Sequence, residues 1–168
     1  MTRERRDISE LLALFRKLGA RDPEGWAESQ VREGIPQLAR FLFLRAAWSC
    51  VVSESDPRWL DVVVARAEAH PSEPYAGVGH ALKSLRSRGA TDEELTDLVR
   101  GVQAEMIFDL CYLLEDPGKL EPEVSDIAWG LFVLNEDGVP VEPLSCLHES
   151  VLEMDPTGRE MRPRGAAG

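Results

Sequence analysis

Two apolar stretches of this chain each contain a single charged residue, and the two charges have opposite sign. Residues 41–52 are apolar or small except for Arg45, and residues 106–114 are apolar or aromatic except for Asp109. A charge in a dry interior costs several kcal/mol unless it is paired and hydrogen-bonded. We therefore expect Arg45 and Asp109 to pair inside the core, or one of them to face a wet cavity.

Apolar residues with helical spacing are clearest in the second half of the chain. From Thr91 onwards the pattern continues for about five turns, with apolar residues at positions 95, 98, 99, 102, 106, 110 and 113. The start is a capping box, in which the Thr91 hydroxyl accepts from the third amide and Glu94 reaches back. The last two turns are apolar on all sides, which predicts a central core helix.

Cap and stop signals divide the rest of the N-terminal part into shorter helices. Gly19 ends one helix, Asp22 and Pro23 begin the next, and Pro36 opens the helix that contains Arg45. Two further helices are predicted over residues 57–70 and about 75–87.

Towards the C-terminus the sequence favours strands and turns. Residues 129–134 favour a strand and residues 135–138 a turn, which predicts a β-hairpin over about 129–141 with Pro140 at an edge. A last short helix is expected within residues 144–154. The predicted fold is mainly α, a compact bundle of about six helices with a small C-terminal β-hairpin. Residues 1–154 are expected to form a single domain, and residues 155–168 a mobile tail.

The net charge of −11 is concentrated in one part of the chain. Residues 91–126 hold 11 acidic and 2 basic residues, a net charge of −9. A field of this sign repels nucleic acid and anionic lipid, and it attracts basic proteins. The sequence therefore predicts no nucleic-acid or membrane partner, and a basic protein is the partner that this charge would suit. The favoured interpretation of the acidic stretch taken alone is a solvated face that maintains solubility.

The cysteines argue against a disulfide framework. Cys50, Cys111 and Cys146 are odd in number and widely spaced, which also argues against a structural zinc site. The charged N-terminus has no signal-peptide pattern, and no apolar stretch reaches the roughly 20 residues of a membrane span. We therefore expect a reduced, cytoplasmic protein.

No catalytic or metal-binding motif stands out. The three histidines lack metal-ligand spacing, and Cys146 and His148 are too close in sequence to face each other readily. The sequence predicts no catalytic residues, no metal and no cofactor. Whether the chain is an enzyme stays open at this point, and a non-enzyme is favoured.

Glu105 and Asp109 lie four residues apart on the longest helix. This spacing lets two carboxylates share a ligand or a proton. The alternative is a structural one, in which Glu105 sits at the rim in water and Asp109 pairs with Arg45.

The leading functional hypothesis is a non-enzymatic acidic interaction domain, such as an inhibitor, an immunity-type protein or a regulator. Glu93 and Asp97 would meet a basic partner, and Trp129, Phe132 and Leu134 would supply apolar anchors.

Two alternatives come from other classes. A small-ligand binder or enzyme would use a semi-buried cluster of Arg45, Glu105 and Asp109. A structural homo-oligomeric module would bury the apolar face of the hairpin between copies.

Overall fold

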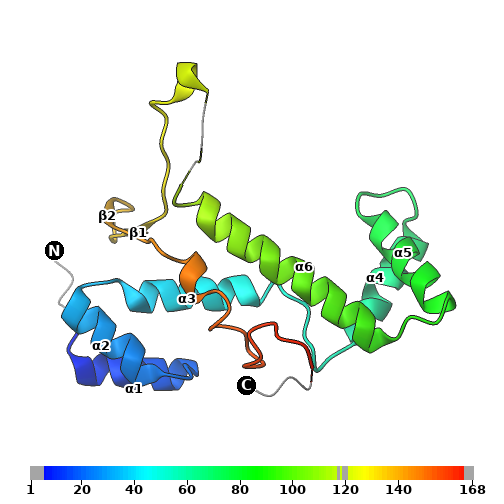
Figure 1. Cartoon of the computed structure of the whole chain (residues 1–168), viewed down its shortest axis with the longest axis horizontal. Coiled ribbons are helices and arrows are strands. Elements are labelled where there is room, and N and C mark those ends of the chain that lie inside the picture. Colours follow the sequence, from blue (N-terminus) through cyan, green and yellow to red (C-terminus); the bar gives the residue numbers. More distant parts are fainter. Residues whose placement is uncertain (1–5, 117, 119–120, 165–168) are drawn as a thin grey trace. The chain divides into compact units, whose positions relative to one another are not determined.

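The computed structural model describes residues 6–116, 118 and 121–164 (Figure 1). These residues are mainly helical, with six α-helices and a two-stranded antiparallel sheet in the C-terminal part, which confirms the predicted fold class. The helices are α1 (Ile8–Leu18), α2 (Pro23–Glu33), α3 (Gln37–Trp48), α4 (Arg58–Ala69), α5 (Ala76–Ser87) and α6 (Asp92–Leu113). The strands are β1 (Phe132–Leu134) and β2 (Pro140–Pro143), and short 3₁₀ helices lie at Pro122–Val124 and His148–Ser150.

Side-chain caps mark the starts of α1, α2 and α6, as the sequence predicts for α2 and α6. The Asp7 side chain accepts from the Glu10 amide at 2.9 Å, which caps α1. At the start of α6, the Glu94 amide donates to the Thr91 hydroxyl at 3.2 Å, and the Thr91 amide donates to the Glu94 carboxylate at 2.8 Å. Gly19 ends α1 with a φ of 82°, a left-handed conformation that glycine adopts without strain.

The hairpin is short and irregular. Phe132 pairs with Pro143 and Val133 with Glu142, and a bulge shifts the register before Leu134. The Asn135 side chain closes the turn, because its oxygen accepts from the Val139 amide at 2.9 Å. Two prolines in β2 remove backbone donors and limit the length of the ladder.

The chain divides into two compact units. The first unit comprises Met1–Ala46 and Leu110–Ser150, and the second comprises Ala47–Asp109 and Val151–Gly168. Helices α3 and α6 therefore contribute residues to both units. The single domain over residues 1–154 stays a prediction.

An aromatic cluster forms the centre of the first unit. Phe15 of α1, Trp26 of α2 and Phe41 of α3 pack with ring centroids 5.5–6.0 Å apart. Leu11 and Leu44 are fully buried with them. Phe41 meets the other two rings edge-to-face, and these contacts hold the three N-terminal helices together.

The second unit is built around the α4–α5 hairpin and the first turn of α6. Leu60, Leu82 and Leu95 form its buried cluster. Gly79 lets α5 approach α4 closely, since a Cβ at this position would lie 2.4 Å from the Ala67 Cβ. A larger residue would force the two helices apart.

Candidate functional site

Helix α6 buries a different face from the one that its apolar pattern predicts. Its buried residues are Leu95, Thr96, Arg100, Ala104 and Cys111. Leu98, Val102 and Met106 are instead 59%, 56% and 55% exposed. The predicted burial of this apolar face is therefore confirmed for Leu95, in the first turn, and wrong for Leu98, Val102 and Met106. The polar residues of the opposite face are buried because they find partners: Thr96, for example, accepts from the Trp59 indole at 3.3 Å.

Arg45, Glu105 and Asp109 are all exposed. The expected burial of these charges is therefore not found, because all three side chains reach solvent. The pairing of Arg45 with Asp109 stays a prediction. Glu105 and Asp109 share the outward side of α6 with Leu98, Val102 and Met106, because residues four apart lie on one helix face. We call these five residues the α6 outward face.

The buried ion pair of the second unit joins Arg100 and Asp155 instead. Their side chains are 3% and 0% exposed and lie 2.9 Å apart. Arg100 also donates to the Val52 carbonyl at 2.7 Å and lies over the Trp48 ring, 5.8 Å from its centroid. This pair fixes the segment after Val151 to α6 and to the loop after α3.

Asp155 is held by hydrogen bonds as well as by charge. Its carboxylate accepts from the Thr157 amide and hydroxyl at 3.0 and 2.8 Å, and from the Met161 amide at 3.3 Å. Burial alone would raise the pKa of Asp155, but these hydrogen bonds and Arg100 lower it overall. The carboxylate is therefore ionised at neutral pH. The Asp155-Pro156-Thr157 pattern, which is typical of a side-chain-closed turn, is the sequence signal for this site.

The acids that were predicted to meet a partner are in contact with the chain's own C-terminal segment. Arg164 lies 2.7 Å from Asp97 and 3.0 Å from Glu93. Arg159 lies 2.7 Å from Glu54 and 3.3 Å from Asp97. The hydrogen bond from Arg164 is the main reason why the pKa of Asp97 is lowered. We call residues 155–164 the C-terminal strap.

The strap contains strained backbone. Glu160 and Met161 have φ angles of 50° and 58°, in the left-handed region that residues other than glycine rarely adopt. Ionic contacts on either side hold this conformation. The predicted mobility of residues 155–168 stays a prediction, and residues 165–168 lie outside the described part of the chain.

A second buried arginine organises the first unit. Arg40 is 4% exposed and donates to Gln37 at 3.1 Å, to Ser150 at 3.2 Å and to the Cys146 carbonyl. It fixes residues 146–150 to α3. Cys146 adopts a φ of 56° beside this contact. The sequence analysis did not single out Arg40 or Arg100, since neither stands alone in an apolar stretch.

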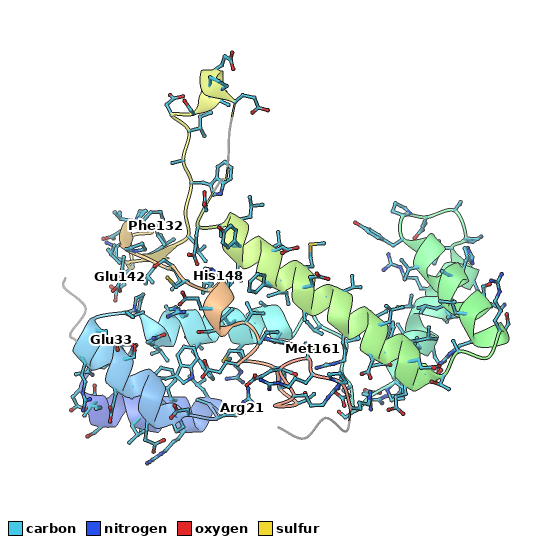
Figure 2. All side chains as sticks on the ribbon, in the orientation of Figure 1. Arg21, Glu33, Phe132, Glu142, His148 and Met161 are labelled. Atoms are coloured by element: carbon cyan, nitrogen blue, oxygen red, sulfur yellow. The ribbon has the colours of Figure 1, made fainter. Side chains whose placement is uncertain are left out.

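His148, which lies two residues after Cys146, is close to Glu115. The Glu115 carboxylate accepts from the Leu147 amide at 2.7 Å and lies 3.7 Å from His148. The ring of His148, which is labelled in Figure 2, contacts Tyr112. Burial, together with the charge of Glu115, raises the pKa of Cys111 to about 11. Cys111 is therefore a neutral, buried thiol rather than a nucleophile.

The three apolar anchors predicted near the hairpin are all exposed. Phe132 and Leu134 alternate with Val133 along β1 and so share one side of the strand. Trp129 lies before the strand and donates its indole N–H to the Leu113 carbonyl at 2.7 Å. The other side of the hairpin, with Val133 and Glu142, lines a hollow of about 360 Å³ beside the α2–α3 turn.

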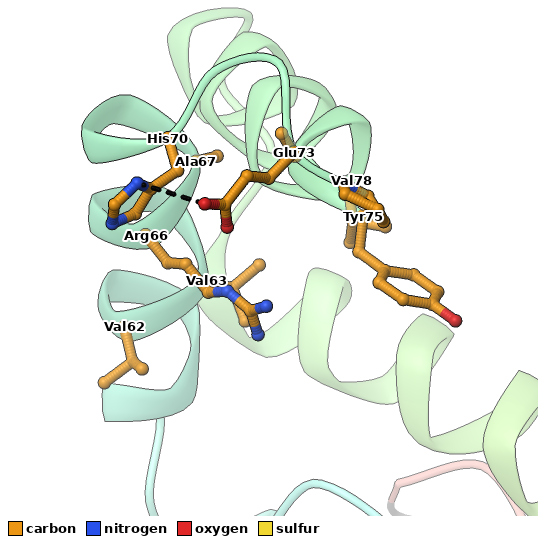
Figure 3. A pocket seen from close by; sticks show the side chains of 10 residues that line it. Val62, Val63, Arg66, Ala67, His70, Glu73, Tyr75 and Val78 are labelled. Atoms are coloured by element: carbon orange, nitrogen blue, oxygen red, sulfur yellow. Dashed lines mark ion pairs between the residues drawn. The ribbon is translucent and has the colours of Figure 1, made fainter.

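A second hollow, of about 230 Å³, lies in the second unit between α4 and the loop that leads into α5 (Figure 3). It is mainly apolar. Arg66 of α4 and Tyr75 of the loop line it, and His70 and Glu73 form an ion pair at its rim, 3.4 Å apart.

Neither a metal-binding group nor a membrane-spanning helix is found among residues 6–116, 118 and 121–164. No three His, Cys, Asp or Glu side chains there are grouped so that they could hold a metal ion. No helix in the same residues is long and apolar enough to cross a membrane. In the comparisons with known proteins, no family, curated protein or solved structure matches this chain.

Proposed function

We propose that the chain is a non-enzymatic, acidic interaction domain that binds an amphipathic basic helix on the α6 outward face. One observation carries this proposal: three large apolar side chains, Leu98, Val102 and Met106, are more than half exposed on successive turns of one helix. A group of exposed apolar residues rimmed by polar ones is typical of a protein-binding surface.

The acidic and apolar residues of the α6 outward face indicate the kind of partner that fits it. Glu105 and Asp109 lie among the apolar residues and make no ion pair with described residues of the second unit. A helix with apolar residues at positions i, i+4 and i+7, flanked by Lys or Arg, would complement them. Burying the exposed half of each apolar side chain would contribute about 1 kcal/mol, and the charges would speed association and set specificity.

A second copy of this chain is a poorer occupant of the same face. Pairing two α6 outward faces would bring Glu105 and Asp109 of both copies close together, and like charges in an interface are unfavourable. Glu93 and Asp97, the acids favoured by the sequence, are less available because Arg159 and Arg164 already neutralise them.

The test uses matched charge reversals. The full chain, a Glu105→Lys/Asp109→Lys variant and a Glu10→Lys/Glu123→Lys control would each be used to capture proteins from the host lysate at low and moderate salt. We expect one basic protein to bind the full chain and the control but not the first variant. With the purified partner, the first variant should bind at least about tenfold more weakly, which corresponds to about 1.4 kcal/mol. Equal binding by both variants would overturn the proposal.

A further inference from the structure

The hollow between α4 and α5 has a defined floor and two different walls. Ala67 and Ala76 are buried at its base, where the close approach at Gly79 brings the two helices together. Val63 and Arg66 of α4 form one wall, and Tyr75 belongs to the other (Figure 3). The volume of about 230 Å³ is smaller than the roughly 300–1,000 Å³ of drug-sized sites. It therefore suits a single apolar group.

Arg66 places a positive charge in the hollow. Its side chain extends from α4 into the space beneath the loop (Figure 3), and it makes no ion pair within the described part of the chain. The nearby Glu73 is engaged by His70 at 3.4 Å. A guanidinium beside apolar walls favours a carboxylate, which it can bind through two parallel hydrogen bonds.

Tyr75 is held in an unusual position. Its φ is 72°, a left-handed conformation that is strained for a residue with a side chain. The side chain is 81% exposed, so packing within the chain does not account for the strain. The conformation keeps an aromatic ring at the edge of the hollow, where it is available to an apolar ligand.

We propose that this hollow binds a carboxylate attached to an apolar group of about the size of a leucine side chain. Arg66 pairs with the carboxylate, and Val63, Ala67 and Tyr75 contact the apolar group. A free apolar acid and the C-terminal residue of a peptide share this chemistry. The site is separate from the α6 outward face and does not depend on the proposed function.

The experiment is an NMR titration of the isotope-labelled full chain with N-acetyl-leucine. We expect saturable shifts of the amides in residues 62–78. N-acetyl-leucinamide keeps the apolar group without the carboxylate, and acetate keeps the carboxylate without the apolar group. N-acetyl-leucinamide should bind at least about tenfold more weakly because it loses the charge-assisted pair with Arg66. Acetate should bind at least about tenfold more weakly because it loses the apolar contact. Equal binding of the acid and the amide would overturn the proposal, as would the absence of saturable shifts in residues 62–78.

Three variants test the residues. Arg66→Gln should abolish the preference for the acid over the amide, and Glu73→Gln should strengthen binding of the acid by removing a nearby negative charge. Arg58→Gln, on the same helix but outside the hollow, is the matched control and should bind as the original chain does. All three side chains are exposed, so the folds should be intact. An unchanged affinity and preference in Arg66→Gln would contradict the assignment. A tetrapeptide ending in leucine then distinguishes the two sources: binding tighter than that of N-acetyl-leucine assigns the site to a peptide C-terminus, and equal or weaker binding assigns it to a free acid.

Discussion

Each unit of this protein uses one buried arginine to hold its C-terminal segment, but the two arginines have different partners. Arg40 holds residues 146–150 of the first unit through the Cys146 carbonyl and the Ser150 hydroxyl, and it also donates to Gln37 on its own helix; all three acceptors are neutral. Arg100 holds the strap of the second unit through the carboxylate of Asp155. Hydrogen bonds between neutral acceptors and a cation depend little on pH. A carboxylate adds strength and also makes the attachment sensitive to acid.

The largest loss in the free energy of unfolding should follow from removing the Asp155 carboxylate of the second unit. Asp155→Ala removes the close counter-charge of the buried Arg100 and leaves it only Glu54, 3.9 Å away. Because the hydrogen bonds to Asp155 are lost as well, we expect the free energy of unfolding to fall by about 3–5 kcal/mol. Urea denaturation followed by circular dichroism measures this loss. Asp126→Ala, at an exposed position of the first unit, is the control and should change little. A loss below about 1 kcal/mol for Asp155→Ala would show that the pair does not anchor the strap.

Acid should loosen the second unit before the first. The folded pKa of Asp155 lies below its usual value, as does that of Asp97. Their stabilisation is therefore complete above the unfolded pKa of about 3.9, and it is lost as pH falls from there through the folded pKa. Amide hydrogen exchange, corrected for intrinsic rates, should show protection at Met161 falling below about pH 4 while Leu144 stays protected. If protection falls at both amides over the same pH range, acid does not loosen the second unit before the first.

Removing the arginine of the first unit should have a smaller effect than Asp155→Ala. Arg40→Met leaves neutral acceptors without a donor, and we expect a loss of about 1–3 kcal/mol in the free energy of unfolding. Urea denaturation of Arg40→Met and Asp155→Ala under the same conditions makes the comparison. If Arg40→Met costs more, the neutral attachment is the stronger one and the comparison is reversed.

The ion pairs of Arg159 and Arg164 in the strap should contribute less to the free energy of unfolding than Arg40 does. Replacing both Arg159 and Arg164 by glutamine removes partly exposed ion pairs, each worth about 0.5–1 kcal/mol at low salt. Thermal unfolding should show this difference at low salt and little difference at 1 M NaCl. Arg162→Gln loses only the exposed contact with Glu160 and is the control. A salt-independent difference would argue for packing rather than charge.

Cysteine labelling gives the mildest probe, because the first unit contains Cys111 and Cys146 and the second contains Cys50. Cys50 and Cys146 are exposed, whereas Cys111 is buried and has its pKa raised to about 11. At pH 8 we expect the folded chain to incorporate two equivalents of iodoacetamide rapidly, and a third only after unfolding. High salt should leave Cys111 protected even where the strap loosens. Mass spectrometry of digested samples identifies the modified positions, and early modification of Cys111 would show that the first unit opens readily.

The helices and their limits could be predicted from the sequence because the interactions that set them are local. Asp7, Asp22 and the Thr91–Glu94 pair each act on amides three residues away. The hairpin was predictable for a similar reason, since Asn135 closes its turn within four residues. The exposure of Trp129, Phe132 and Leu134 also agrees with their position in a short, two-sided hairpin.

The burial of particular charges was decided only by the tertiary structure. Apolar spacing on α6 marks the Leu98–Val102–Met106 side as the inner one, yet the opposite side is buried. Arg100 is buried because Asp155, 55 residues later in the chain, folds back to neutralise it. Arg45 and Asp109 are exposed. The sequence by itself determined where the helices begin and end. Which helix face is dry depends on partners distant in the chain, since a buried charge needs a specific counter-charge in three dimensions.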